Sequence, residues 1–154
     1  MGIQRRTFLK KTGATIACTC MAGCTALEAA ETNQAIYAVE GVQSDDTKLV
    51  IDLSKHPNLK EVGGSETFQT GGFLFFKKKV IVLHPDETSY KAFENKCTHM
   101  GGQVAYMHKD GFMQCSWHGS RFDTQGQVVK GPAKKPLTEL KTSLDKDQLT
   151  VYLP

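Results

Sequence analysis

The sequence predicts an all-β protein, folded as an antiparallel sandwich or a small barrel, from three observations. Short runs of β-branched, aromatic and other apolar residues recur from about residue 48 onward. Gly-Gly, Pro-Asp and Asp-Gly pairs, which favour turns, separate these runs. No long stretch has the 3.6-residue periodicity of an amphipathic helix, so a helical bundle is not expected.

Each predicted strand is short and stands next to a turn signal. The strands are expected at residues 48–53, 72–76, 80–83, 90–94, 112–115 and 149–153. The turns are expected at Gly-Gly 63–64, 71–72 and 101–102, at Pro-Asp 85–86 and at Asp-Gly 110–111. Lys109-Asp110-Gly111-Phe112 predicts a hairpin turn leading into the strand at 112–115.

The charge of the chain is unevenly distributed along its length. The 154 residues carry a net charge of +3, but the first 23 residues hold Arg5, Arg6, Lys10, Lys11 and no acidic residue. The remainder therefore has 15 basic and 16 acidic residues and a net charge of −1. Nucleic acid is accordingly not expected as a partner.

The N-terminal segment has the features of an export signal. Gln4-Arg5-Arg6-Thr7-Phe8-Leu9-Lys10 precedes a weakly apolar stretch, residues 12–27, and resembles a twin-arginine signal, which directs folded proteins across a bacterial inner membrane. A Sec signal or a basic amphipathic start is the alternative. We therefore expect the protein on the periplasmic side of the inner membrane or elsewhere in the cell envelope.

The end of this signal allows three outcomes. Met21-Ala22-Gly23-Cys24 resembles a lipobox, with Cys24 as the lipid-bearing residue, and this is the outcome we favour. The alternatives are an uncleaved anchor, for which residues 12–27 would reach only ~24 Å against ~30 Å of hydrocarbon, and release by cleavage near Cys24. The expected organisation is a signal at 1–24, a small polar tether at 25–35 and a folded domain at 36–154.

Two short Cys/His segments carry the chemistry of the folded part. Cysteines 18, 20 and 24 lie in or at the end of the signal, which leaves Cys97 and Cys115, followed closely by His99 and His118. Two thiolates and two imidazoles suit a thiophilic, borderline metal. Because each segment supplies one sulfur and one nitrogen, the pattern fits a two-iron cluster in which one iron takes both cysteines and the other both histidines. A disulfide or a Cys2His2 zinc site is the alternative.

These segments resemble a known family in order and spacing. Cys97-Thr98-His99-Met100-Gly101 and Cys115-Ser116-Trp117-His118-Gly119-Ser120-Arg121-Phe122-Asp123 resemble the two binding boxes of the Rieske iron–sulfur proteins. Gly131-Pro132-Ala133, followed by Pro136-Leu137, resembles the third loop that covers the cluster in that family. The resemblance runs from about residue 49 to 151.

The resemblance implies a fold and a cofactor. The expected fold is a Rieske-type antiparallel β-sandwich with a small cluster-binding subdomain at about 96–136. One [2Fe–2S] cluster per chain would bind to Cys97, His99, Cys115 and His118, and the Ser120 hydroxyl would donate to a bridging sulfide. The glycines at 101 and 119 would let backbone N–H groups approach the bridging sulfides.

The sequence departs from the high-potential members of the family at three positions. Gly102 and Trp117 stand where those members have two cysteines that form a disulfide between the loops. Phe122 stands where they have a tyrosine that donates to a cysteine sulfur. Hydrogen bonds to sulfur stabilise the reduced state, so the resemblance implies a potential below the top of the roughly −150 to +300 mV Rieske range.

The resemblance also implies one-electron transfer, by an electron-transfer protein or a redox subunit rather than by a stand-alone enzyme. The expected partner is a respiratory or periplasmic oxidoreductase, with a cytochrome or a molybdenum-type subunit. The alternative is a quinol-oxidising Rieske subunit of a cytochrome bc-type complex, in which electron and proton transfer would be coupled at the ligand histidines. A Rieske oxygenase would need a further iron domain and is disfavoured.

Several other polar residues have weaker signals. His56, His84 and His108 are interpreted as surface or turn residues rather than ligands. Lys77-Lys78-Lys79 and Lys134-Lys135 are interpreted as solvated lysines on strand ends and loops, and a docking face for an acidic partner is the alternative.

Overall fold

The structure is a computed structural model, and it describes residues 40–70 and 78–154. The twin-arginine segment, Cys24, the tether and the strand predicted at 72–76 lie outside the described residues. Within the described ranges, no helix is both long and apolar enough to cross a membrane.

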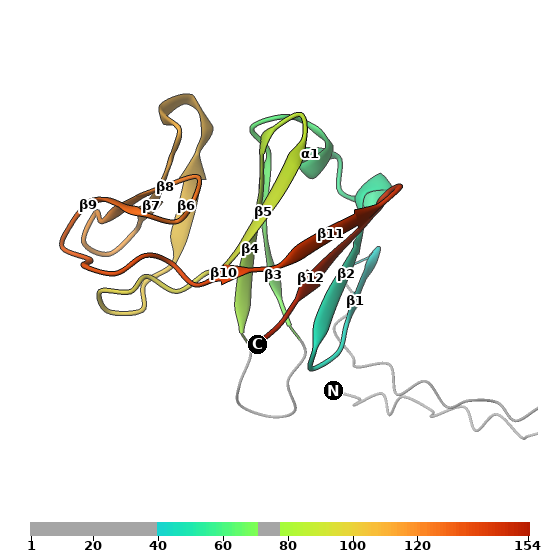
Figure 1. The fold of residues 1–154 in the computed structure, drawn as a ribbon, viewed down its shortest axis with the longest axis horizontal. Helices are drawn as coiled ribbons and strands as arrows, with labels where there is room; N and C mark the ends of the chain where they lie inside the picture. Colours follow the sequence, from blue (N-terminus) through green and yellow to red (C-terminus); the bar gives the residue numbers. More distant parts are fainter. Residues whose placement is uncertain (1–39, 71–77) are drawn as a thin grey trace, which may run out of the picture. The chain divides into compact units, whose positions relative to one another are not determined.

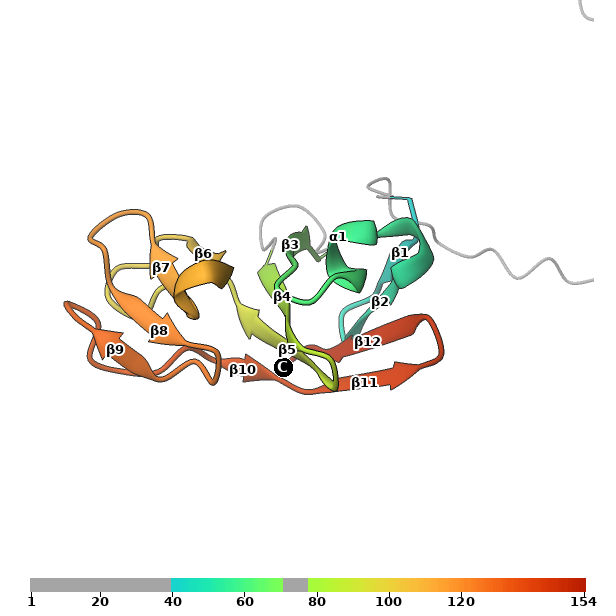
Figure 2. The same cartoon turned by 90° about the horizontal axis from the view of Figure 1, so that it is seen from above.

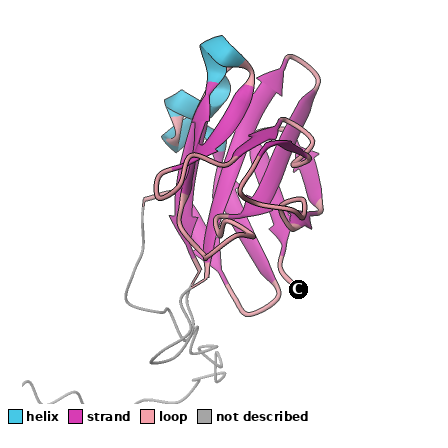
Figure 3. Ribbon diagram, turned by 90° about the vertical axis from the view of Figure 1, so that its left-hand side faces the viewer, coloured by secondary structure: helices cyan, strands magenta, loops and turns pink. Residues whose placement is uncertain are grey.

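The described chain is almost entirely antiparallel β-structure (Figures 1 and 3). The strands are β1 Val42–Ser44, β2 Lys48–Asp52, β3 Ser65–Gln69, β4 Lys79–Asp86, β5 Ser89–Glu94, β6 Val104–Met107, β7 Phe112–Cys115, β8 Arg121–Asp123, β9 Val128–Lys130, β10 Glu139–Leu140, β11 Thr142–Asp145 and β12 Gln148–Tyr152. The helical turns are η1 Leu53–Lys55, α1 Pro57–Lys60 and η2 His108–Asp110. The strands form three sheets, with the orders β1-β2-β12-β11, β10-β5-β4-β3 and β6-β7-β8-β9.

The middle sheet contributes to two hydrophobic cores, and strand β4 explains why. Successive side chains of a strand point to opposite faces. Val80 and Val82 of β4 belong to the core shared with the first sheet, whereas Ile81 and Leu83 belong to the core shared with the third sheet. All four are at most 2% exposed, and full burial of such a side chain contributes about 1.5–3 kcal/mol. The predicted all-β sandwich with a separate cluster-binding part is confirmed.

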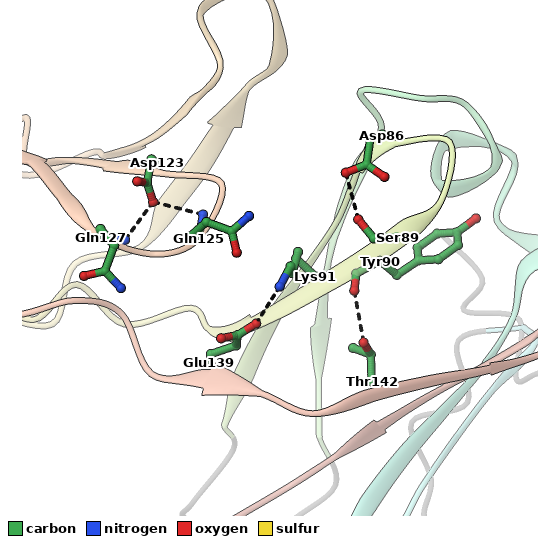
Figure 4. A network of polar contacts seen from close by, with 9 residues as sticks. All are labelled: Asp86, Ser89, Tyr90, Lys91, Asp123, Gln125, Gln127, Glu139 and Thr142. Carbon is green, nitrogen blue, oxygen red and sulfur yellow. Dashed lines mark hydrogen bonds and ion pairs between the residues drawn. The ribbon is translucent and has the colours of Figure 1, made fainter.

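The third sheet is an insertion between two paired strands of the middle sheet. The chain leaves β5 at Glu94, forms β6 to β9 and returns as β10, which pairs with β5 so that Glu139 faces Phe93 (Figure 2). An ion pair of 3.0 Å between Lys91 Nζ and Glu139 Oε1 joins the same two strands (Figure 4). Both ends of the insertion are thereby fixed to one place on the middle sheet.

The turn predictions have different outcomes. The predicted turn into 112–115 is confirmed, because η2 connects β6 to β7 and Gly111 has a left-handed φ of 69°. The turn predicted at Pro85-Asp86 lies directly after this pair, at Glu87-Thr88, because β4 continues through Asp86 with an irregular register between Leu83 and Asp86. Such an irregularity accommodates a proline, which has no N–H to donate to the ladder.

Two of the three histidines interpreted as surface or turn residues are buried instead. His56 is 4% exposed, and its Nδ1 lies 3.1 Å from Glu66 Oε2. His84 is 7% exposed and stacks on the Tyr90 ring at a centroid distance of 4.3 Å. His108 is exposed, as expected. An imidazole ring packs well when one nitrogen has a partner or its face meets an aromatic ring, and the sequence pattern does not reveal such partners.

Candidate cluster-binding site

Two loops with the same backbone closure carry the four candidate ligands. Loop 1 is residues 95–103, between β5 and β6, and loop 2 is residues 116–120, between β7 and β8. The Cys97 N–H donates to the Gly102 carbonyl at 2.7 Å, and the Cys115 N–H donates to the Ser120 carbonyl at 2.8 Å. In both loops the cysteine N–H thus closes a turn onto the fifth residue along the chain.

The glycines of the two boxes have a role in the backbone of the turns. Gly101 and Gly119 each lie four residues after a cysteine, and each donates its N–H to the carbonyl of that cysteine. Their φ angles are 82° and 68°, in the left-handed region that glycine adopts at little cost. The turn geometry therefore requires these glycines, and both N–H groups already have acceptors within the loops.

The two sulfurs and the two imidazoles lie at different depths. Cys97 and Cys115 are each 2% exposed, and both are free thiols. His99 and His118 are exposed, and their rings meet edge to face at a centroid distance of 4.9 Å. The loops therefore present a buried sulfur pair and an adjacent imidazole pair at the surface.

The environment of Cys97 shifts the pKa of its thiol. Burial raises the pKa of the Cys97 thiol above its ordinary value, and the neighbouring Cys115 side chain raises it further. Hydrogen bonds from the His99 backbone N–H and the Ser120 side chain lower it. Because thiolates are the metal-binding form, metal binding at this site releases protons.

Gly102 and Trp117, which stand where high-potential members have a disulfide, pack against each other. A Cβ atom added at Gly102 would lie 2.8 Å from Trp117 Cγ and 3.0 Å from Cys115 Sγ. The Trp117 indole therefore lies directly against the Gly102 backbone, which closes the gap between loops 1 and 2 beside a ligand sulfur. The Ser116 N–H also donates to the Gln103 carbonyl at 3.0 Å and connects the same two loops.

Loop 3, residues 131–138, connects to both ligand loops. The Thr98 hydroxyl donates to the Lys135 carbonyl at 2.6 Å. Ser120 is 0% exposed, and its Oγ accepts the Ala133 N–H at 3.0 Å, which leaves the Ser120 hydroxyl proton free to point toward sulfur. This agrees with the donor role expected for Ser120.

Asn95 and Thr98 support the site, although the sequence interpretation did not assign them roles. Asn95 is 5% exposed, accepts the Val104 N–H at 2.7 Å and donates to Thr67 Oγ1 at 3.1 Å. Asn95 therefore joins loop 1, β6 and the middle sheet. The sequence could have indicated this role only through the position of Asn95, two residues before Cys97.

The donor arrangement fits a two-iron cluster better than one metal ion. The candidate ligands are a sulfur pair and an imidazole pair, as a cluster with separate cysteine and histidine irons requires. Gly102 lies so close to this sulfur pair that an added Cβ would meet Cys115 Sγ at 3.0 Å.

Comparisons with known proteins agree with this arrangement. The sequence model of the Rieske [2Fe-2S] domain matches residues 55–142, more than half of the chain. The cytochrome b6-f complex iron-sulfur subunit 2 of Nostoc sp. is 39% identical over 57 residues, which are 37% of this chain and 32% of that protein. The cytochrome b6-f complex iron-sulfur subunit of Synechococcus elongatus is 32% identical over 75 residues, which are 49% of this chain and 42% of that protein.

A solved structure supports the fold. The quaternary ammonium Rieske monooxygenase CntA aligns over 62% of this chain and 29% of its own, with 13% identity and a TM-score of 0.50. The matched region spans about a third to two fifths of the cytochrome b6-f relatives. Because the family match covers both ligand loops and loop 3, the chain belongs to the Rieske [2Fe-2S] domain family and carries that family's [2Fe–2S] cluster.

Proposed function

We propose that the chain is an exported electron carrier that holds its cluster through Cys97, His99, Cys115 and His118. The observation that supports this assignment most strongly is the pair of exposed imidazoles, 4.9 Å apart, beside two buried thiols on loops of identical closure. The cluster supplies a one-electron couple when bound. The chain would act as a small subunit or partner of a respiratory or periplasmic oxidoreductase.

The residues of the chain have distinct tasks in this proposal. The buried cysteines exclude water from the sulfur side, which strengthens each hydrogen bond made there. Ser120 directs its hydroxyl proton toward sulfur, while its oxygen is held by the Ala133 N–H. The exposed imidazoles provide the route to a partner.

Ligand substitution tests the assignment. His118→Ala should abolish the EPR signal of the reduced cluster and lower the iron content. His108→Ala is the matched control, because His108 is also exposed but packs against Tyr106 at a centroid distance of 6.0 Å. Full iron and an unaltered spectrum in His118→Ala would refute the ligand assignment.

The proposed location in the cell envelope rests on the sequence of the first 24 residues. Replacing Arg5 and Arg6 together by lysine should retain the protein in the cytoplasm, as cell fractionation would measure. Cys24→Ser should remove fatty-acid labelling, whereas Cys20→Ser should keep it. Export of the lysine variant at the normal rate would contradict the twin-arginine assignment.

A second candidate function is quinol oxidation within a cytochrome bc-type complex. The relatives named as cytochrome b6-f complex subunits favour it. Affinity purification from membranes separates the two candidates, because a co-purifying b-type cytochrome would support quinol oxidation. A molybdenum-containing subunit would support the first proposal.

A further inference from the structure

The ligand loops have a charge pattern that differs from the rest of the protein. Loops 1, 2 and 3, defined above, contain Lys96, Lys134 and Lys135 and no acidic residue. Beyond residue 23, the chain outside these loops has 12 basic residues against all 16 acidic ones. Positive charge is therefore concentrated at the site on an otherwise acidic chain.

The structure places these lysines around loop 1. The aliphatic part of Lys96 runs along Gly101, because a Cβ added at Gly101 would lie 3.6 Å from Lys96 Cε. Lys135 is held next to Thr98 by the 2.6 Å hydrogen bond to its carbonyl, and Lys134 adjoins it in the chain. All three lysines are exposed.

Two large apolar side chains lie within the same surface. Met100 is 63% exposed and Trp117 is 62% exposed, and each is adjacent in sequence to a ligand histidine. Exposed methionine and tryptophan are typical of the centres of protein interfaces, which charged residues surround.

From these observations we infer that the ligand loops form a docking face for an acidic redox partner protein, an inference that rests on the proposed electron-transfer function. Met100 and Trp117 make apolar contact beside the histidines, and the lysines steer the partner's negative surface toward them. Glu66 lines a cavity of about 520 Å³ with Gly101 and Trp117, but its carboxylate already interacts with His56.

The test uses one partner in two charge forms. The purified, reduced, cluster-containing full chain is mixed in a stopped-flow instrument with native, basic cytochrome c or with its succinylated, acidic derivative. The rate with the acidic form should exceed the rate with the basic form at low salt and should fall as ionic strength rises.

Charge-reversal variants locate the effect. Lys134→Glu with Lys135→Glu should slow the acidic partner about tenfold or more at low salt. Lys48→Glu with Lys141→Glu is the matched control, because both lysines are exposed, belong to none of the three loops and give the same change in charge. The rate of electron transfer to uncharged benzoquinone should be equal in both double variants. The midpoint potential of each variant is measured so that the rates can be corrected for any difference in driving force.

The outcomes separate this inference from the proposed function. If the cluster forms and donates electrons but both double variants slow the acidic partner equally, or if salt has no effect, the lysines are merely solvated and the docking inference is wrong. If the purified chain has no reducible cluster, the proposed function itself fails.

Discussion

Phe122→Tyr tests how the hydrogen-bond environment sets the reduction potential. Phe122 is 0% exposed and belongs to the same core as Cys97 and Cys115. A hydroxyl added to its ring cannot reach water, so it must either find an acceptor in this core or remain unsatisfied. The family resemblance implies that the acceptor is a cysteine sulfur.

The expected size of the effect follows from the energy of one hydrogen bond. If the new bond is stronger in the reduced state by about 1 kcal/mol, the potential rises by about 40 mV, since about 59 mV corresponds to 1.4 kcal/mol for one electron. An unsatisfied hydroxyl would instead lower the free energy of unfolding by about 1–3 kcal/mol without changing the potential.

Redox titration and urea unfolding of the cluster-containing protein distinguish these results. Phe112→Tyr is the matched control, because Phe112 is only half-buried beneath the Arg121 guanidinium, 4.4 Å from its ring centroid. An unchanged or lower potential in Phe122→Tyr, with the cluster intact, would refute the proposed control of potential.

Three further predictions concern packing, support and pH. Gly102→Ala should displace Trp117, the chain's single tryptophan, because their contact would shorten to 2.8 Å; the intrinsic fluorescence should shift and the cluster content should fall. Asn95→Ala should lower the free energy of unfolding by about 1–3 kcal/mol, as urea titration measures, because it leaves the buried Val104 N–H without its acceptor. Hydrogen bonds from Thr88 and Ser89 lower the pKa of Asp86 from 3.8 to about 2. The Asp86 carboxylate therefore stabilises the folded protein fully above about pH 4, and this contribution disappears as the pH falls through 2. Asp86→Ala should destabilise the protein at pH 7 and have little effect near pH 2. Equal destabilisation at both pH values would contradict that account.

The sequence was most informative where local chemistry determines structure. The spacing of Cys97, His99, Cys115 and His118 predicted that two short segments would come together, and the structure brings them together. The turn at Gly111 was also predictable, because a left-handed position after Asp110 depends on the local sequence alone.

Features that depend on distant parts of the chain were not predictable in this way. Nothing around His84 in the sequence indicates that Tyr90 will stack on it from the next strand. Gly102 and Trp117 stand where high-potential members have two cysteines, so the sequence predicted that the disulfide is absent. It did not predict that the two residues pack against each other, because this contact joins two separate loops. The left-handed φ of Gly101 and Gly119, and their hydrogen bonds back to the cysteine carbonyls, were likewise not part of the sequence prediction.

The insertion between β5 and β10 has a consequence for how such proteins can arise and be engineered. Its two ends are neighbours across a single strand pair, so the 44 residues from 95 to 138 enter and leave the middle sheet at one point. Removing them would leave β5 and β10 in a position to be rejoined by a short hairpin loop. Conversely, an unrelated antiparallel sheet could accept this cassette if one of its faces offered apolar residues equivalent to Ile81, Leu83 and Phe93. A single recombination event could thus give a redox centre to a β-sandwich that had none.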